Sequence, residues 1–139
     1  DKVETGEKTE ESIRGMHILL AEDNELNMEI AEFMLQNEGA VVTKAWNGQE
    51  AVELFEKSRS GKIDVILMDI MMPVMNGYEA TKMIRSLERE DAKTVPIIAM
   101  TANAFTEDRL KAKEAGMDEH IAKPVDPELL VKVIYESVD

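Results

Sequence analysis

Residues 63–77, IDVILMDIMMPVMNG, hold the pattern that decides the fold. Ile63–Met68 is a short, mainly apolar run, and it ends on the carboxylate of Asp69. The run lacks the regular polar alternation of a strand that has one face in water, so we expect a strand covered on both faces. Tyr78–Glu88 follows as a predicted helix. This order of buried strand, loop and helix is typical of an α/β protein with a parallel sheet.

The same unit of strand and helix occurs five times along the chain. Short apolar runs predict the strands, and apolar residues at helical spacing predict the helices, with Asn24 and Asp126 as N-caps. The predicted strands are Met16–Ala21, Ala40–Ala45, Ile63–Met68, Val95–Met100 and His120–Ala122. The predicted helices are Glu25–Glu38, Gln49–Ser60, Tyr78–Glu88, Thr106–Ala115 and Pro127–Val138. Right-handed crossovers between such elements favour a doubly wound sheet between two helical layers.

Composition narrows the possible functions. The 139 residues include 29 acidic and 16 basic side chains, which gives a net charge of −13, and no cysteine. The acidic balance argues against direct binding to nucleic acid, and the lack of cysteine excludes disulfides and thiolate metal sites. No apolar run approaches the roughly 20 residues that cross a membrane. We therefore expect a cytoplasmic domain that makes no membrane contact itself.

The chain is expected to form one domain with an N-terminal extension. Residues 1–14 are acidic and poor in apolar side chains, which predicts a flexible linker. Residues 15–139 are enough for a single domain with its own core, and too few for two.

Charged or hydroxyl-bearing residues stand at the ends of four of the five predicted strands. Glu22 and Asp23 follow the first strand, Asp69 the third, Thr101 the fourth and Lys123 the fifth. The carboxyl ends of strands in a doubly wound sheet meet at one edge, where ligands bind. Crowded carboxylates need a proton or a cation among them, and oxygen ligands without His or Cys favour Mg²⁺. The sequence therefore predicts a magnesium site at this edge.

A carboxylate beside Mg²⁺ can attack phosphorus. Asp69 would then form an acyl phosphate, while Thr101 and Lys123 hydrogen-bond the transferred oxygens. Taken singly, an acidic pair at a strand end is more often a solvated loop, and a lysine there is more often a surface charge. The convergence of four strand ends favours the catalytic interpretation.

Four motifs resemble those of a known family. They are LLAEDNELN (19–27), DVILMDIMMPVMNGYEAT (64–81), PIIAMTANAF (96–105) and GMDEHIAKPVD (116–126). In this order and spacing they resemble the receiver (response-regulator) domains of two-component phosphorelays, from about Met16 to the end of the chain. The resemblance implies a flavodoxin-like (βα)5 fold, an α/β class whose five parallel strands have the order 2-1-3-4-5.

The resemblance also implies a role for each residue at the strand ends. Asp69 would be the phosphoacceptor, with Mg²⁺, for which Mn²⁺ can substitute, as cofactor. The implied metal ligands are Glu22, Asp23, Asp69 and the backbone carbonyl of Met71. Thr101 would be the switch hydroxyl, Lys123 would pair with the phosphoryl group, and Lys123-Pro124 would be a cis peptide.

Two positions affect how such a domain works. His120 stands where the family usually has Tyr or Phe, an aromatic ring that turns inward when Thr101 moves. His120 therefore puts that switch in doubt: it can turn and add pH sensitivity, or be an ordinary half-exposed strand-end residue. Met71 and Asn103 occupy positions that tune hydrolysis of the acyl phosphate, Met71 by shielding it and Asn103 by orienting a water molecule.

Within the family, EDNELN (22–27) and MTANAF (100–105) resemble receivers of hybrid sensor histidine kinases. A free-standing response regulator is the alternative parent. The expected partner is the dimerisation and phosphoacceptor domain of a histidine kinase or a histidine phosphotransfer domain, and a homodimer is compatible with the pattern, as is a membrane-anchored parent kinase. Leu26, Asn27 and Ile30 are candidates for the docking face, with core packing as the other interpretation of Leu26.

Two other classes of protein share parts of this pattern. Mg²⁺-dependent phosphohydrolases also use an Asp nucleophile, but they carry a second Asp two residues later, where this chain has Met71. A flavin-binding domain needs a phosphate-binding loop after the first strand, where Glu22 and Asp23 would repel the phosphate. A receiver that no longer accepts phosphoryl groups would lack one of the key residues, and none is missing.

Overall fold

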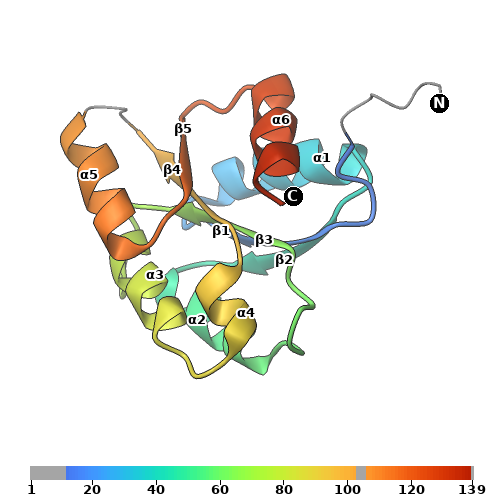
Figure 1. Ribbon diagram of the computed structural model, residues 1–139. Helices are drawn as coiled ribbons and strands as arrows, with labels where there is room; N and C mark the ends of the chain where they lie inside the picture. Colours follow the sequence, from blue (N-terminus) through green and yellow to red (C-terminus); the bar gives the residue numbers. More distant parts are fainter. Residues whose placement is uncertain (1–11, 103–105, 139) are drawn as a thin grey trace.

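The computed structural model describes residues 12–102 and 106–138, and they form a parallel sheet with helices on both sides (Figure 1). The strands are β1 (His17–Ala21), β2 (Val41–Ala45), β3 (Val65–Asp69), β4 (Ile97–Thr101) and β5 (Glu119–Ala122). The helices are α1 (Glu25–Asn37), α2 (Gly48–Lys57), α3 (Gly77–Arg85), α4 (Glu90–Thr94), α5 (Thr106–Ala115) and α6 (Pro127–Ser137). The order along the sheet is β2-β1-β3-β4-β5, which confirms the predicted flavodoxin-like (βα)5 topology.

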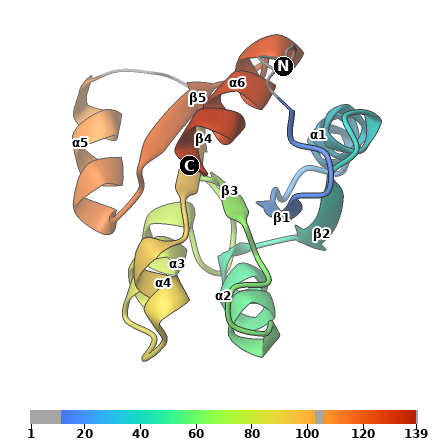
Figure 2. The same cartoon turned by 45° about the vertical axis from the view of Figure 1, so that its right-hand side comes forward.

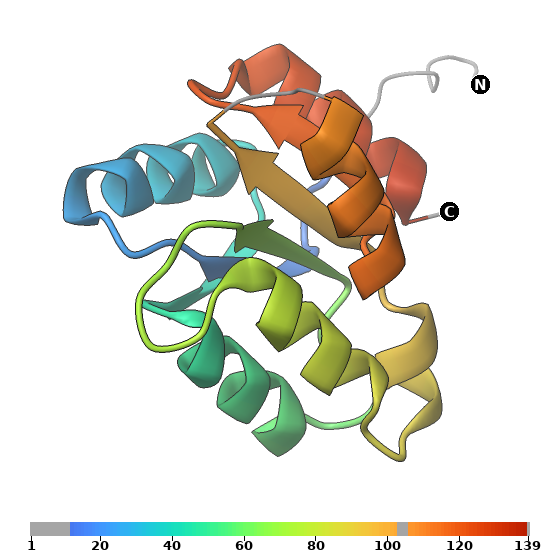
Figure 3. The same cartoon turned by 90° about the vertical axis from the view of Figure 1, so that its left-hand side faces the viewer.

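The register brings the carboxyl ends of the central strands to one edge. Ala21 of β1 lies opposite Ala45 of β2 and Met68 of β3. Asp69 at the end of β3 pairs with Met100 of β4. In Figure 3 the loop that follows β3 lies at the end to which the β3 and β4 arrows point. Residues just beyond the strands are therefore neighbours in space, as a doubly wound sheet requires.

The sheet separates two apolar cores. Side chains alternate between the faces of each strand, so Ile66 and Met68 of β3 face one core while Val65 and Leu67 face the other. One core is covered by α2, α3, α4 and α5, and the other by α1 and α6, which Figure 2 shows on opposite sides of the sheet. Every residue of β3 is buried, which explains why its sequence shows no polar alternation.

The packed domain begins slightly before the boundary predicted from composition. Ile13 has no exposed surface and belongs to the core beneath α1 and α6. Most of the predicted linker, residues 1–11, lies outside the described residues. No helix in the described ranges is both long and apolar enough to span a bilayer.

Side-chain caps fix where most helices begin. Asn24 accepts from the Asn27 N–H at 2.9 Å, and Asp126 accepts from the Leu129 N–H at 2.9 Å, as the sequence predicts. Asn76 caps α3 in a reciprocal capping box with Glu79. These caps start α1, α3 and α6 directly after the loops that follow β1, β3 and β5, and so fix the exits of those strands.

The segment between α3 and β4 differs from the prediction. The helix expected over Tyr78–Glu88 ends at Arg85, and Glu90–Thr94 forms the additional short helix α4. Its five residues include one buried side chain, Ala92, too few for a recognisable apolar period.

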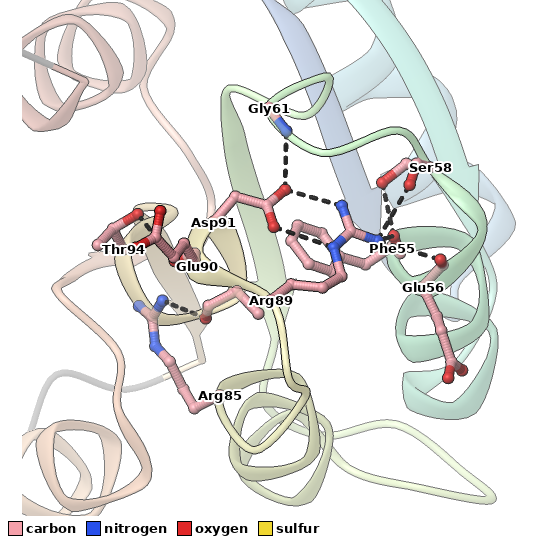
Figure 4. Close-up of polar contacts among 10 residues, drawn as sticks. Phe55, Glu56, Ser58, Gly61, Arg85, Arg89, Glu90, Asp91 and Thr94 are labelled. Carbon is pink, nitrogen blue, oxygen red and sulfur yellow. Dashed lines mark hydrogen bonds and ion pairs between the residues drawn. The ribbon is translucent and has the colours of Figure 1, made fainter.

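Arg89, at the start of α4, ties this segment to the end of α2 (Figure 4). Its Nη1 donates to the carbonyls of Phe55, Glu56 and Ser58 at 3.0, 3.1 and 3.0 Å. The guanidinium also lies 4.7 Å from the centre of the Phe55 ring. Helix carbonyls without intrahelical partners need donors, and Arg89 supplies them.

Asp91 holds Arg89 in this position. It accepts from Arg89 Nε and Nη2 at 2.9 and 2.8 Å, and from the Gly61 N–H at 2.9 Å. The hydrogen bonds from Arg89 lower the pKa of Asp91, so the pair stays charged near neutral pH. This network of hydrogen bonds lies at the end of the sheet opposite the carboxyl ends of the strands.

We predict that Arg89→Ala lowers the free energy of unfolding by about 2–3 kcal/mol, because several partly buried carbonyls and one carboxylate lose their donor. Urea denaturation followed by circular dichroism measures the change. Arg59→Ala is the matched control, since Arg59 is an exposed arginine nearby in the α2–β3 connection. An equal effect of the two substitutions would contradict this assignment.

Candidate phosphoryl-acceptor site

Three polar residues at the carboxyl edge of the sheet are almost fully buried. Glu22 is 2% exposed, Asp69 4% and Thr101 6%. Asp23, directly after Glu22, is exposed. Burying a carboxylate is costly unless it is paired, so a cation is needed here.

Lys123 supplies that cation. Its Nζ lies 2.9 Å from Glu22 Oε1 and 3.0 Å from Asp69 Oδ2. The second oxygen of Glu22 accepts from the Asn24 N–H at 3.1 Å, so the loop after β1 holds this carboxylate in place. With Asp23, the edge carries three carboxylates against one ammonium group, an excess of two negative charges.

Burial and the neighbouring charges shift the pKa values of Asp69 and Lys123. Burial raises the pKa of Asp69 to about 6; Glu22 adds to the rise, and the hydrogen bond from Lys123 opposes it. For Lys123, burial works against the charged form, but the hydrogen bonds to Glu22 and Asp69 prevail and raise its pKa. Lys123 therefore remains an ammonium ion at neutral pH, and Asp69 takes up a proton at a pH well above that of an ordinary aspartate.

The acidic residues can hold a metal ion. Glu22, Asp23 and Asp69 each place a carboxylate oxygen within 4.8 Å of the others. The set contains only oxygen donors and carries excess negative charge, which fits a hard divalent cation such as Mg²⁺. The structure thus brings together the three side chains that the sequence predicts as ligands. The fourth predicted ligand, the Met71 carbonyl, remains a prediction.

Two glycines keep the loop after β3 close to the sheet. A Cβ on Gly77 would overlap the Asp69 carbonyl oxygen, and a Cβ on Gly48 would overlap the Met75 carbonyl. The Gly77 N–H donates to the Ile70 carbonyl at 2.8 Å, and the Gly48 N–H to the Met75 carbonyl at 2.9 Å. Asp69 is therefore held by a backbone that tolerates no side chain at either position.

Val74, in the same loop, has a φ of 69°, which is strained for a β-branched residue. The Met75 N–H donates to the Pro73 carbonyl at 2.7 Å across it, which closes a three-residue turn. Sequence reasoning missed Val74, because nothing in its side chain signals a positive φ. Strain of this kind is concentrated at functional sites.

The structure describes the remaining predicted residues except one. The Lys123-Pro124 peptide is cis, as the family resemblance implies. Met71 is 74% exposed, beside the buried Asp69. His120 is half-buried, and its Nε2 accepts from Arg109 Nε at 3.1 Å. Asn103 lies outside the described residues.

Besides the face that packs on the core, α1 carries a second apolar stripe that is exposed. Leu26 is 64% exposed, Ile30 43% and Phe33 69%. Their spacing places them along one side of the helix. The core interpretation of Leu26 is therefore wrong, and the docking interpretation remains. Phe33 extends the same stripe, although it is not among the residues predicted for docking.

The strand order and the acidic edge define a flavodoxin-like α/β domain with a charged site at the strand carboxyl ends. The model of the response regulator receiver domain matches residues 18–135. The chain belongs to this family, whose members serve two-component signalling.

Several proteins with similar sequences are histidine kinases. Histidine kinase 1 of Arabidopsis thaliana is 38% identical over 91% of this chain, and hybrid signal transduction histidine kinase I of Dictyostelium discoideum is 40% identical over 87%. The matches span 13% and 7% of those proteins, so this chain corresponds to a small part of each.

Solved structures show the same fold. The receiver domain of a sensor histidine kinase from Pseudomonas aeruginosa, with magnesium coordinated in its active-site cleft, is 41% identical, with a TM-score of 0.81 over 89% of this chain and 98% of that one. A co-crystal structure from Saccharomyces cerevisiae pairs a histidine phosphotransfer protein with the receiver domain of its downstream response regulator. The match is 33% identical, with a TM-score of 0.80 over 90% of each chain.

We predict that Asp23→Asn weakens Mg²⁺ binding at least tenfold, because an exposed charged ligand is replaced by a neutral one. Trp46 can report the binding by fluorescence. It is the chain's single tryptophan and follows Ala45, whose carbonyl accepts from the Glu22 N–H. Glu25→Gln is the control, because this acid lies in the first turn of α1 outside the cluster. Unchanged affinity in Asp23→Asn would remove Asp23 from the ligand set.

The raised pKa of Asp69 predicts a pH dependence of metal binding. Below about pH 6 a growing fraction of Asp69 carries a proton, which competes with the cation, so the apparent Kd for Mg²⁺ rises as pH falls from 7 to 5. Titrations at several pH values measure this, with Asp69→Asn as the comparison. If the apparent Kd of Asp69→Asn rose as steeply with falling pH as that of the wild type, a group other than Asp69 would cause the effect.

Proposed function

We propose that this domain accepts a phosphoryl group from phosphohistidine onto Asp69 in a Mg²⁺-dependent reaction. The observation that carries the proposal is the pairing of buried Asp69 with Lys123 inside a cluster of three carboxylates at the strand carboxyl edge. Membership of the receiver family supports the same conclusion.

The residues fit the roles that such a transfer needs. A carboxylate oxygen of Asp69 bonds to phosphorus while the bond from phosphorus to the donor's imidazole nitrogen breaks, and the imidazole leaves with the electron pair. Bound Mg²⁺ would neutralise the carboxylates and the charge on the phosphoryl oxygens. The ammonium group of Lys123, now 3.0 Å from Asp69 Oδ2, is close enough to stabilise the new dianion. Positioning and charge stabilisation account for most of such a reaction.

Transfer then changes the surface of the domain. The new dianion competes with Glu22 for Lys123 and attracts the hydroxyl of Thr101, which is 6% exposed at the end of β4. These movements shift an existing equilibrium between two arrangements of the following loops. We assign Met71 the role of shielding the acyl phosphate, since its exposed side chain follows the acceptor by two residues.

The open face of α1 is the proposed docking surface for the phosphodonor. Leu26, Ile30 and Phe33 form its apolar stripe. A shallow depression lined by Ile30 and Met34 continues from it to Pro124 and Val125, next to Lys123. A helix carrying the phosphohistidine can pack here and reach Asp69, which fits the helical phosphoacceptor domain of a kinase or a histidine phosphotransfer domain.

The kinases matched above also favour a parent protein of the hybrid histidine kinase type. The chain aligns with a short part of each of these two kinases, as expected for one domain of a longer kinase. A free-standing response regulator is the alternative parent. The autophosphorylating activity of a kinase would then belong to a separate protein.

Incubation with acetyl phosphate tests the proposal. We expect the intact mass to increase by one phosphoryl group when Mg²⁺ is present, with no increase after chelation or in Asp69→Asn. Asp64→Asn is the matched control, because Asp64 lies at the opposite end of β3 and pairs with His17. Labelling that persists in Asp69→Asn, or that needs no divalent cation, would contradict the proposal.

Docking through α1 predicts a separate defect. Phe33→Ala should slow transfer from a phosphorylated histidine phosphotransfer domain about tenfold or more, because an exposed aromatic ring at an interface contributes on the order of 1–2 kcal/mol. Labelling by acetyl phosphate should stay unchanged. Met83→Ala, an exposed apolar residue on α3, is the control. An equal loss with both phosphodonors would show that Phe33 acts on folding instead.

A further inference from the structure

We propose that the hydrogen bond between Arg109 and His120 is a proton-sensitive latch that holds the start of α5 against β5. The inference deepens the proposed function and rests on it, because it assigns a pH-dependent restraint to the segment that follows Thr101. Arg109 lies on α5 and His120 on β5.

The geometry of the contact requires a neutral imidazole. Arg109 Nε lies 3.1 Å from His120 Nε2. A guanidinium N–H is always a donor, so the His120 nitrogen must accept and cannot carry a proton. When solvent protonates Nε2, the acceptor is lost and two cations face each other. An unperturbed imidazole is the side chain whose charge changes between about pH 5 and 8.

The described side chains of α5, those of residues 109–115, bury little apolar surface. Its described buried residues are Ala112 and Ala115, which offer little apolar surface, while Leu110 is 58% exposed. Burial of an alanine stabilises far less than burial of a leucine, because the stabilisation scales with the apolar area removed from water. The Arg109–His120 hydrogen bond therefore adds a polar attachment to a helix whose described residues bury little apolar surface.

When His120 is protonated, the charged residues around it do not replace the hydrogen bond from Arg109. Ile121 faces the core beneath α6, so His120 faces the opposite side of the sheet, toward α5. Arg109 and Lys113 of α5 line this surface, together with Asp118 and Glu119 of the β5 strand and the turn before it. β4 contributes the uncharged Ala99 beside His120. From α3, Arg85 reaches only as far as Gly116 and Asp118.

Asp118 is already engaged. Its Oδ2 accepts from Arg85 Nη2 at 2.9 Å and from the Ile97 N–H at 2.9 Å. Glu119 is exposed, so its attraction for a protonated His120 is screened by water. Protonation of His120 therefore weakens the attachment of α5 rather than strengthening it.

The latch joins the two segments that move in the proposed switch. α5 begins five residues after Thr101, and His120 precedes Lys123 by three residues. A bond between Arg109 and His120 therefore links the chain leaving Thr101 to the strand leading into Lys123. Its loss lowers the cost of moving α5 when Thr101 turns toward a phosphoryl group.

Two measurements on the unphosphorylated, metal-free chain test the latch. Hydrogen exchange at pH 8 compares the wild type with Arg109→Met, whose side chain reaches about as far as the arginine Nε but has no donor. Lys113→Met, one turn along α5, is the matched control. An NMR titration from pH 8 to 5.5 then follows the imidazole of His120 and the α5 amides. His17, the only other histidine, lies on β1 and serves as the internal reference.

We expect exchange in α5 to rise about two- to fivefold in Arg109→Met and to stay unchanged in Lys113→Met, as the loss of one partly exposed hydrogen bond implies. In the wild type the α5 amide shifts should follow the titration of His120, and in His120→Phe they should stop depending on pH. Equal exchange in Arg109→Met and wild type, or α5 shifts that ignore His120, would overturn the latch. Neither measurement depends on Asp69. Failure of the chain to accept a phosphoryl group would therefore overturn the proposed function and leave the latch unaffected.

Discussion

The paired contacts of Lys123 with Glu22 and Asp69 are the interaction on which the site depends. Two carboxylates that are almost without exposed surface lie in the same edge of the sheet, and a cation must lie between them for the fold to tolerate both. One ammonium group cannot balance the full set of acids. The remaining negative charge suits a divalent cation, and burial raises the pKa of Asp69 to about 6.

The parallel sheet makes this arrangement possible. Strands β1, β3 and β5 are separated along the chain by helices, yet their register delivers Glu22, Asp69 and Lys123 to one edge. Glycines at positions 48 and 77 allow the loop after β3 to pack against its neighbours without a side chain between them. At the other end of the sheet, Arg89 donates hydrogen bonds to the last carbonyls of α2. These bonds join α4 to α2 on the side away from the phosphoryl-acceptor site.

Much of this arrangement is predictable from the sequence, because the physical signals are local. The apolar run that ends on Asp69 and the N-caps Asn24 and Asp126 predict element boundaries to within a few residues. Strand-end position alone predicts which carboxylates meet. Features set by tertiary contacts are not predictable in this way. α4 has too few apolar residues for a recognisable period, the positive φ of Val74 has no side-chain signal, and the Arg109 contact to His120 joins residues on different elements.

The most direct test of the central claim is a crystal structure of this chain grown with Mg²⁺ and beryllofluoride, which mimics a phosphoryl group on a carboxylate. The account predicts beryllium bonded to an oxygen of Asp69, Mg²⁺ among the carboxylates of Glu22, Asp23 and Asp69, and Lys123 turned from Asp69 Oδ2 to a fluoride. Beryllofluoride on another carboxylate, or none bound while Lys123 keeps both of its present partners, would contradict it.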